Sequence, residues 1–184
     1  MPFFMSCSVM LENFINWKIY GVSEQTFQSM KIKIISVTSK KNQFNSEIDR
    51  YIKMLPSFMK VEQLELPISK RSKQKAILQN IEEESERILR HIGPSDYLII
   101  MDEHGKQIDT IEFSEWLKRW MDESAQPVLV IGGPDGLGQS IKERANASLS
   151  LSSLTYAHSM VPLILAEQLY RAWSILDNQP YHRQ

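Results

Sequence analysis

The sequence predicts an α/β domain in which a parallel sheet carries helices on both of its faces. From Met30 onward, segments typical of strands alternate with segments typical of helices, and this order favours α/β layers. The strand segments YLIIM and PVLVI are nearly continuous apolar runs, as in parallel strands that are covered on both faces. With 184 residues and 42% hydrophobic content, the chain can bury one sizeable core but hardly two.

The boundaries of the elements follow from these patterns and from the turn residues between them. Strands are expected at Lys31–Thr38, Val61–Leu66, Asp96–Met101, Pro127–Gly132 and Ser148–Leu154. Helices are expected at Phe44–Met54, Ser72–His91, Thr110–Met121, Gly138–Asn146 and Ser159–Leu176. The second helix carries an acidic run, which we expect to form a solvated face: Glu82, Glu83, Glu84 and Glu86.

The chain changes character at Met30. Residues 1–29 mix aromatic and polar residues without a clear period, whereas the segment after Met30 reads as a strand. We therefore expect Met30 to be the natural initiator, with residues 1–29 a start-site artefact and residues 30–184 the functional domain. The alternative is an accessory helix around Leu11–Tyr20.

Composition narrows the class of protein. The net charge is −1, so any contact with RNA must come from a local basic patch. The single cysteine, Cys7, excludes a disulfide within the chain and argues against a cysteine-based zinc site, and no metal is expected. No apolar run approaches the roughly 20 residues that span a bilayer, and the apolar start lacks the features of a signal peptide. A cytoplasmic protein without a membrane partner is expected.

Two loops carry candidate ligand-binding residues. The segment Ile131–Leu137 (IGGPDGL) follows the fourth strand, and its glycines allow a close approach to a ligand or merely form a turn. The segment Leu151–His158 (LSSLTYAH) offers small polar groups and ends in a histidine before the last helix. That histidine, His158, suits proton transfer near neutral pH, or it has a helix-capping or core role.

The last helix, Ser159–Leu176, is apolar on more than one face, which predicts burial against its own sheet and against a second copy of the chain. Pro162 is tolerable because it falls in the first turn. Glu167 and Arg171 are spaced for an ordinary ion pair along the helix surface.

Two further segments are candidates for contact with RNA. The run Lys70–Lys75 places four positive charges within six residues, and it suits either phosphate binding or a solvated loop. The terminus Asn178–Gln184 combines an aromatic ring, an imidazole and a guanidinium, which suit a base or phosphate contact. Terminal residues are by default poorly ordered, which is the alternative.

Four motifs stand in the order and register of one known family: Ile131–Leu137, Ser150–His158 (SLSSLTYAH), Ala166–Trp173 (AEQLYRAW) and Asn178–Arg183 (NQPYHR). Together with the start at Met30 and the Pro67–Arg71 segment, they make the chain resemble the ribosomal RNA large subunit methyltransferase H family. The resemblance covers Met30 to Gln184 and leaves out residues 1–29.

The resemblance implies a SPOUT fold with a C-terminal trefoil knot, and a homodimer. It also implies S-adenosylmethionine-dependent methylation of N3 of a pseudouridine in large-subunit rRNA within the assembled ribosome. By the same analogy the cofactor site is lined by Met101, Gly132, Leu151, Ser152, Ser153, Leu154, Thr155 and Tyr156.

The resemblance further implies that four residues place the RNA base and manage its proton: His158, Tyr181, His182 and Arg183. His182 and Arg183 are expected to reach the site from the dimer partner. Family members commonly have an arginine where this chain has Pro162, so its work would pass to Arg171 or to the terminus. The alternatives are a SPOUT methyltransferase of another RNA such as tRNA, and a non-catalytic ribosome-binding factor.

Overall fold

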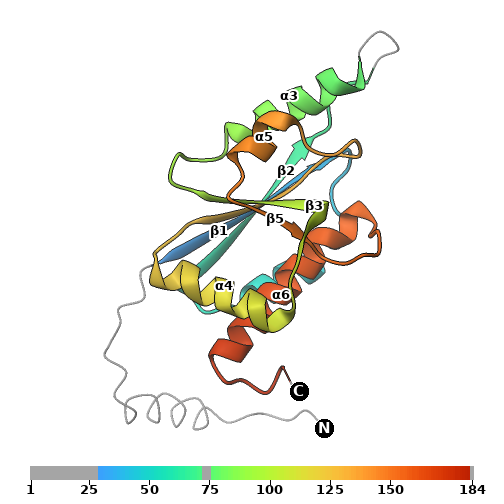
Figure 1. Ribbon diagram of the computed structural model, residues 1–184. Helices are drawn as coiled ribbons and strands as arrows, with labels where there is room; N and C mark the ends of the chain where they lie inside the picture. The colour runs from blue at the N-terminus through green and yellow to red at the C-terminus, as the bar shows by residue number, and fades with distance from the viewer. Residues whose placement is uncertain (1–28, 72–75, 183–184) are drawn as a thin grey trace.

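Five parallel strands form one sheet in the computed structural model, which describes residues 29–71 and 76–182 (Figure 1). The strand order is β2-β1-β4-β3-β5. The strands are β1 (Met30–Thr38), β2 (Met59–Pro67), β3 (Tyr97–Gln107), β4 (Pro127–Ile131) and β5 (Ala147–Ser150). The predicted parallel sheet is therefore confirmed. Residues 1–28 of the N-terminal extension, including Leu11–Tyr20, lie outside the described residues.

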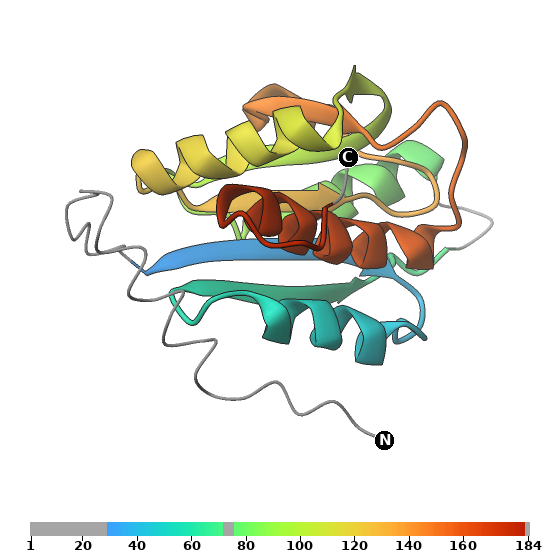
Figure 2. The same ribbon diagram turned by 90° about the horizontal axis from the view of Figure 1, so that it is seen from below.

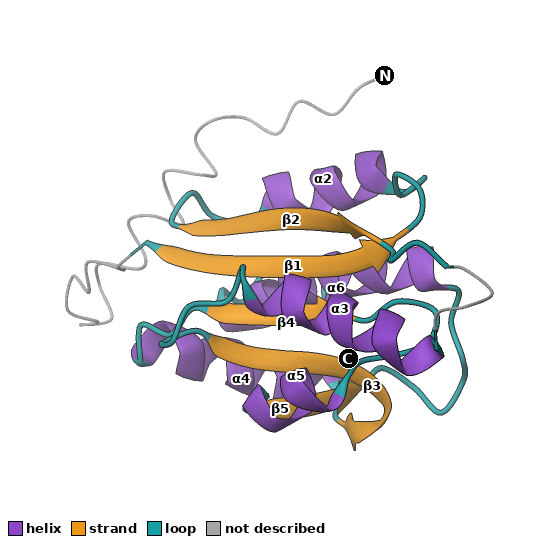
Figure 3. Cartoon of the chain, turned by 90° about the horizontal axis from the view of Figure 1, so that it is seen from above, coloured by secondary structure: helices purple, strands orange, loops and turns teal. Residues whose placement is uncertain are grey.

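Helices cover both faces of the sheet, as predicted (Figure 1). Figure 2 shows α2 (Asn45–Met54), α4 (Thr110–Asp122) and α6 (Val161–Leu176) in front of one face. Figure 3 shows α3 (Ile77–Leu89) and α5 (Gln139–Arg144) in front of the other. No helix of the described ranges is long and apolar enough to cross a membrane.

The strand side chains supply two apolar cores, one on each face. Along β3, Ile99 packs into the core beneath α4 and α6, whereas Leu98 and Ile100 pack into the core beneath α3 and α5. All five residues of β4 are buried, which accounts for its continuous apolar sequence. Each fully buried Ile or Leu contributes about 1.5–3 kcal/mol of hydrophobic stabilisation.

The helix α6 lies against α4 and α2. Leu165 and Leu169 are buried in the core, while Leu163 and Ile164 remain partly exposed. Pro162 occupies the first turn, and Arg171 pairs with Glu167, as predicted. Burial against a second copy of the chain stays a prediction.

Two strand boundaries were predicted wrongly. β3 continues beyond Met101 to Gln107, because a bulge after Met101 lets Lys106 and Gln107 pair with β5. Gly105 permits this close pairing, since a Cβ there would lie 2.7 Å from the carbonyl carbon of Leu149. β5 ends at Ser150 rather than at Leu154.

Serine side chains explain the early end of β5. The Ser150 hydroxyl donates to the carbonyl of Ser152 at 3.0 Å, and the Ser152 hydroxyl accepts from the amide of Leu154 at 2.9 Å. These local bonds hold the backbone in turns instead of a ladder.

The acidic run in α3 was also interpreted wrongly at one position. Glu83 and Glu86 are exposed, but Glu84 is only 2% exposed. Its Oε1 accepts a hydrogen bond from the amide of Ser69 at 2.7 Å, which compensates part of the cost of burial. The helix itself begins at Ile77, and residues 72–75 lie outside the described ranges.

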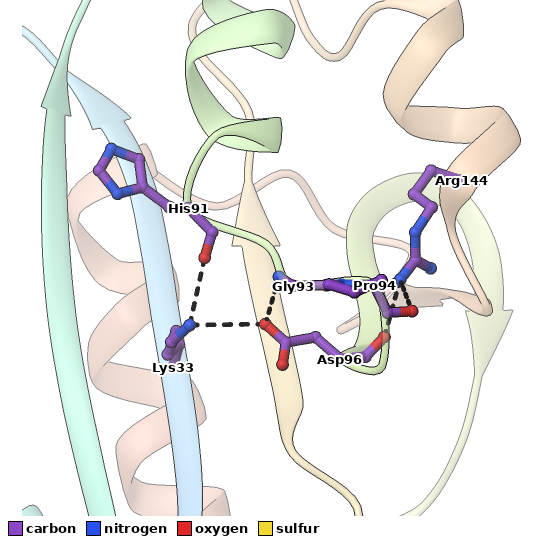
Figure 4. A network of polar contacts seen from close by, with 6 residues as sticks. All are labelled: Lys33, His91, Gly93, Pro94, Asp96 and Arg144. Atoms are coloured by element: carbon purple, nitrogen blue, oxygen red, sulfur yellow. Dashed lines mark hydrogen bonds and ion pairs between the residues drawn. The ribbon is translucent and has the colours of Figure 1, made fainter.

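A polar network ties together the loops near the amino ends of β3 and β5 (Figure 4). The Lys33 ammonium donates to the carbonyl of His91 at 3.2 Å and pairs with Asp96 at 3.4 Å. Arg144, the last residue of α5, donates to the carbonyls of Gly93, Pro94 and Asp96 at 3.0–3.2 Å. This network lies at the edge of the sheet opposite the candidate site described next.

Candidate functional site

A cavity of about 600 Å³ opens at the carboxyl ends of β3, β4 and β5. Open parallel sheets bind ligands at this edge, because the loops that leave the strands converge there. The walls come from Met101–His104 of β3, from the glycine loop (Ile131–Leu137) and from Lys142 of α5. The end of β5 and the loop after it, between Leu149 and His158, complete them. The two loops singled out in the sequence therefore face the same cavity.

The glycine loop needs its glycines for steric reasons. A Cβ on Gly132 would lie 2.8 Å from the Leu137 Cγ, and one on Gly133 would lie 2.4 Å from a carboxylate oxygen of Glu84. Gly136 has a φ of +89°, which closes a turn in which its amide donates to the Gly133 carbonyl at 3.0 Å. The loop is thus both a tight turn and a wall of the cavity.

The helix α3 supports the glycine loop from behind. The amide of Gly138 donates to the Ser85 hydroxyl at 2.8 Å, and that hydroxyl donates to the carbonyl of Ile81. The Glu84 carboxylate lies against Gly133 and holds the amide of Ser69, as described above. Such packing on a helix keeps a binding loop in one conformation.

Most of the predicted cofactor-binding residues lie in the walls of this cavity: Met101, Gly132, Leu151, Ser152, Leu154, Thr155 and Tyr156. Ser153 belongs to the same loop but does not line the cavity. Leu154 is 71% exposed and Tyr156 is 37% exposed, so the loop leaves two large apolar side chains at the rim. The binding roles of these residues stay predictions.

His158 is joined directly to the glycine loop. It begins a short 3-10 helix (His158–Met160) that leads into α6. Its Nε2 lies 2.8 Å from the carbonyl oxygen of Gly132. A carbonyl only accepts, so Nε2 carries the hydrogen, and in the neutral ring Nδ1 is then free to accept a proton.

A second cavity, of about 210 Å³, lies at the carboxyl end of β1 and shares His158 with the larger cavity. It is lined by Ser36, Thr38, Lys40, Lys41, Asn42, Gln43, His158 and Ser159. His158 is the residue that the two cavities share among their described linings. The sequence reading did not single out this group of residues.

An ion pair in the wall of the larger cavity was also missed. Lys142 of α5 lies 3.1 Å from Asp102, and both residues line the cavity. A hydrogen bond from the backbone amide of His104, followed by Lys142, lowers the pKa of the Asp102 carboxyl. The position of Asp102 after a buried apolar strand could have indicated it, whereas nothing in the sequence pattern indicates Lys142.

Tyr181 and His182, the C-terminal candidates that the structure describes, line neither cavity of their own chain. The Tyr181 ring packs against Tyr170, with 4.7 Å between ring centroids, and lies under the Arg171 guanidinium. Its hydroxyl donates to Glu167 at 3.2 Å. Burial, together with Tyr51 and Glu167, raises the pKa of the Tyr181 phenol. His182 has a buried Nδ1 without a hydrogen-bond partner among the described residues, and Arg183 lies outside them.

The basic segment after β2 is only partly described. Arg71 forms an ion pair with Asp135 of the glycine loop, whereas Lys73 and Lys75 lie outside the described residues. Arg171, considered above as a substitute for the missing arginine, is itself paired with Glu167. No cluster of His, Cys, Asp and Glu in the described ranges could hold a metal ion.

Comparison with known proteins agrees with this architecture. The family model described as a predicted SPOUT methyltransferase matches residues 30–182. A ribosomal RNA large subunit methyltransferase H from Francisella philomiragia is 42% identical over 155 residues, covering 84% of this chain and 100% of that protein. The protein of that name from Methylobacillus flagellatus is 42% identical over 156 residues, covering 84% of this chain and 100% of that protein. The one from Pseudothermotoga lettingae is 37% identical over 153 residues, covering 83% of this chain and 99% of that protein. The chain therefore belongs to the SPOUT methyltransferases, in the ribosomal RNA large subunit methyltransferase H family.

Proposed function

We propose that this protein methylates N3 of a pseudouridine in large-subunit rRNA within the assembled ribosome, using S-adenosylmethionine. The observation that carries the proposal is the larger cavity, where the glycine loop and the loop after β5 meet and are joined by the bond between His158 and Gly132. The relatives named ribosomal RNA large subunit methyltransferase H support the class of substrate.

The residues of the larger cavity suit S-adenosylmethionine. Its volume of about 600 Å³ falls within the usual range for small-molecule sites. Met101 and Leu151 offer apolar contacts for the adenosine part, and Gly132 leaves room beside the backbone. The Asp102–Lys142 pair offers one anion and one cation to the ammonium and carboxylate of the amino-acid part. When bound, the cofactor supplies an electrophilic methyl group.

His158 is proposed to manage the proton of the acceptor. Methylation of a pseudouridine N3 requires loss of the proton on that nitrogen. With Nε2 donating to Gly132, the free Nδ1 of a neutral His158 is available to accept it. The bond between His158 and Gly132 also fixes the proton acceptor beside the cofactor cavity. The protein's further contribution to the reaction is to align the acceptor nitrogen with the methyl group.

A homodimer is part of the proposal. The helix α6 leaves Leu163 and Ile164 partly exposed, and Met160 just before it is 38% exposed. A second copy packed on this surface would bury these side chains. His182 and Arg183 are then proposed to enter the partner's site, since the described His182 lines neither of the two cavities of its own chain.

The functional domain is proposed to span residues 30–184. The family model matches from residue 30, and β1 begins at Met30.

The test uses ribosomes from a strain that lacks the gene for this protein. Purified protein and radiolabelled S-adenosylmethionine are expected to label the large-subunit rRNA, and mass spectrometry should find one methyl group on a pseudouridine. Deproteinised rRNA and total tRNA serve as parallel substrates. Labelling of tRNA alone would show that the protein is a methyltransferase of another RNA. Binding to ribosomes without any labelling would favour a non-catalytic ribosome-binding factor.

A further inference from the structure

We propose that the second cavity holds a backbone phosphate of the RNA beside the acceptor nucleotide, with Lys40 and Lys41 as its cationic contacts. This inference rests on the proposed function, because it specifies where the RNA chain enters relative to the cofactor cavity. Neither lysine belongs to the motifs that carry the family resemblance. The argument depends on position, charge and shape.

The second cavity lies next to the proposed reaction centre along the sheet. In the ladder between β1 and β4, Ser36 is paired with Ile131, the residue just before the glycine loop. Ser36 lines the second cavity, and Ile131 lines the larger one. The imidazole of His158 stands between them and is bonded to Gly132. A nucleotide whose base lies over His158 therefore has a neighbouring phosphate within reach of the second cavity.

The charge of the second cavity favours an anion. Its lining contains two lysines and no acidic side chain. Lys40 and Lys41 are exposed, and neither forms an ion pair within residues 29–71 and 76–182. The nearby Glu65 carboxylate is already engaged, accepting from the amide of Asn42 at 3.0 Å and from Asn45 at 3.1 Å. On a chain of net charge −1, this is a local excess of positive charge.

The loop that carries the two lysines is anchored at both ends. The Thr38 hydroxyl donates to the carbonyl of Lys40 at 2.9 Å. The Asn42 side-chain amide donates to the carbonyl of Ser159 at 2.9 Å, which ties this loop to the segment that carries His158. The ammonium groups are therefore mounted on a backbone that is fixed relative to the candidate proton acceptor.

The size and lining of the cavity select a phosphate over a base. At about 210 Å³, it is roughly a third of the 600 Å³ of the larger cavity, enough for a phosphate with its ribose. Bases are held mainly by stacking on aromatic or guanidinium planes, and among the described lining residues the one such plane is the His158 imidazole, which also lines the larger cavity. Lysine acts as a compact point charge and hydroxyls add donors, as in many phosphate contacts.

A phosphate contact positions the RNA without reading its sequence. Loss of the contact should weaken binding of the ribosome while leaving the cofactor cavity intact. The test variant is the double substitution Lys40→Met and Lys41→Met. Its matched control is Lys31→Met and Lys60→Met, which also removes two exposed lysines. These two lysines are paired with each other near the amino ends of β1 and β2, away from the second cavity.

Two binding measurements are made on the full-length protein. Affinity for S-adenosylhomocysteine is measured by calorimetry, and affinity for unmethylated ribosomes is measured at several monovalent salt concentrations. In the Lys40/Lys41 variant the affinity for ribosomes should fall about tenfold, and the slope of log affinity against log salt should shrink by about one to two. The control and the affinity for S-adenosylhomocysteine should stay within twofold of the unmodified protein.

Each other result overturns the inference. Unchanged ribosome affinity and salt slope would mean that no phosphate is bound by these lysines. A parallel loss of S-adenosylhomocysteine binding would assign the second cavity to the cofactor. The double variant Lys40→Arg and Lys41→Arg should retain ribosome affinity, which separates a charge contact from a folding defect. These readouts need no methyl transfer, so a protein that binds ribosomes without methylating them would contradict the proposed function separately.

Discussion

Single residues of the larger cavity allow its proposed contacts with the cofactor to be tested. Asp102 and Lys142 come from different elements and form an ion pair in its wall. Asp102→Asn should lower the affinity for S-adenosylhomocysteine about 10- to 100-fold, because a charge-assisted contact to the ammonium group is lost. Affinity for methylthioadenosine, which lacks the amino-acid part, should be unchanged in the same calorimetric titration.

A matched control for this variant is Asp122→Asn, since Asp122 pairs with Lys118 at the same distance of 3.1 Å on α4, away from the cavity. Asp122→Asn should leave both affinities unaltered. Equal losses for both ligands in Asp102→Asn would mean that the residue supports the cavity wall instead of contacting the amino-acid part.

His158 can be tested without removing its structural bond. His158→Gln keeps a side-chain amide that can donate to the Gly132 carbonyl, but it has no nitrogen that can accept a proton. The turnover of ribosome methylation should fall about 10²- to 10⁴-fold, with S-adenosylhomocysteine affinity within twofold. Turnover equal to that of the unmodified protein would exclude His158 as the proton acceptor.

Arg144 is a residue whose effect should be confined to stability. It donates to three carbonyls at the edge of the sheet opposite the cavities (Figure 4). Arg144→Met should lower the free energy of unfolding by about 1–3 kcal/mol, because the carbonyls of Gly93 and Asp96, in part-buried hydrogen bonds, lose a charged donor. Chemical denaturation measures this loss. A change in S-adenosylhomocysteine affinity would contradict the separation of the two edges.

At the level of residues, the sequence indicated candidate site residues that lie within one short motif. It missed contacts that form only when segments far apart in the chain meet in the fold. Gly132 and His158 stand out because each belongs to a recognisable local pattern. Lys142 and Asp102 are separated by 40 positions, and their ion pair exists only after α5 packs beside β3. Lys40 and Lys41 follow an unremarkable strand, so only the folded loop shows that they share a cavity with His158.

Among the elements, α3 and the glycine loop depend on one another. Gly133 faces the buried Glu84 carboxylate, and a methyl group there would meet it at 2.4 Å. Gly133→Ala should therefore lower the free energy of unfolding by about 1–3 kcal/mol through overpacking. It should also weaken S-adenosylhomocysteine binding, because the loop lines the cavity. The combined variant Gly133→Ala with Glu84→Asp, which shortens the carboxylate side chain, should recover part of both losses.

The same pair shows why element-level prediction failed in places. A run of acidic residues on a helix predicts a solvated face. The run does not show that the backbone amide of Ser69 donates a hydrogen bond to Glu84 in the fold. The predicted strand β5 extended into a segment where, in the structure, serine hydroxyls form local hydrogen bonds with the backbone. β3 was cut short because Asp102 to Lys106 reads as polar loop, although a bulge and Gly105 keep it paired with β5.

For the whole molecule, the alternation of strand and helix segments was sufficient to predict the parallel sheet and its two helical layers. The order β2-β1-β4-β3-β5 could not be read from the segments, because it depends on which strands pair across long crossovers. The trefoil knot that the family resemblance implies stays a prediction. The dimer, which the resemblance and the apolar faces of the last helix predict, stays one as well.

The proposed dimer predicts that active sites are shared between copies. His158 lines the cavities of its own chain, whereas the described Tyr181 and His182 do not. His158→Gln and His182→Ala should each be nearly inactive as homodimers. Mixed dimers, purified through a different tag on each copy, should regain about half of the unmodified activity, because one of their two sites then combines two intact residues.

The recovery distinguishes a shared site from one built within a single chain. If both histidines acted in the same chain's site, each site of the mixed dimer would contain one defect, and activity would stay at the level of the single variants. Met160→Glu, placed on the partly exposed start of α6, should additionally shift the protein to monomers in sedimentation and abolish the recovery. Leu78→Glu, on the exposed face of α3, introduces the same charge and should leave the dimer intact.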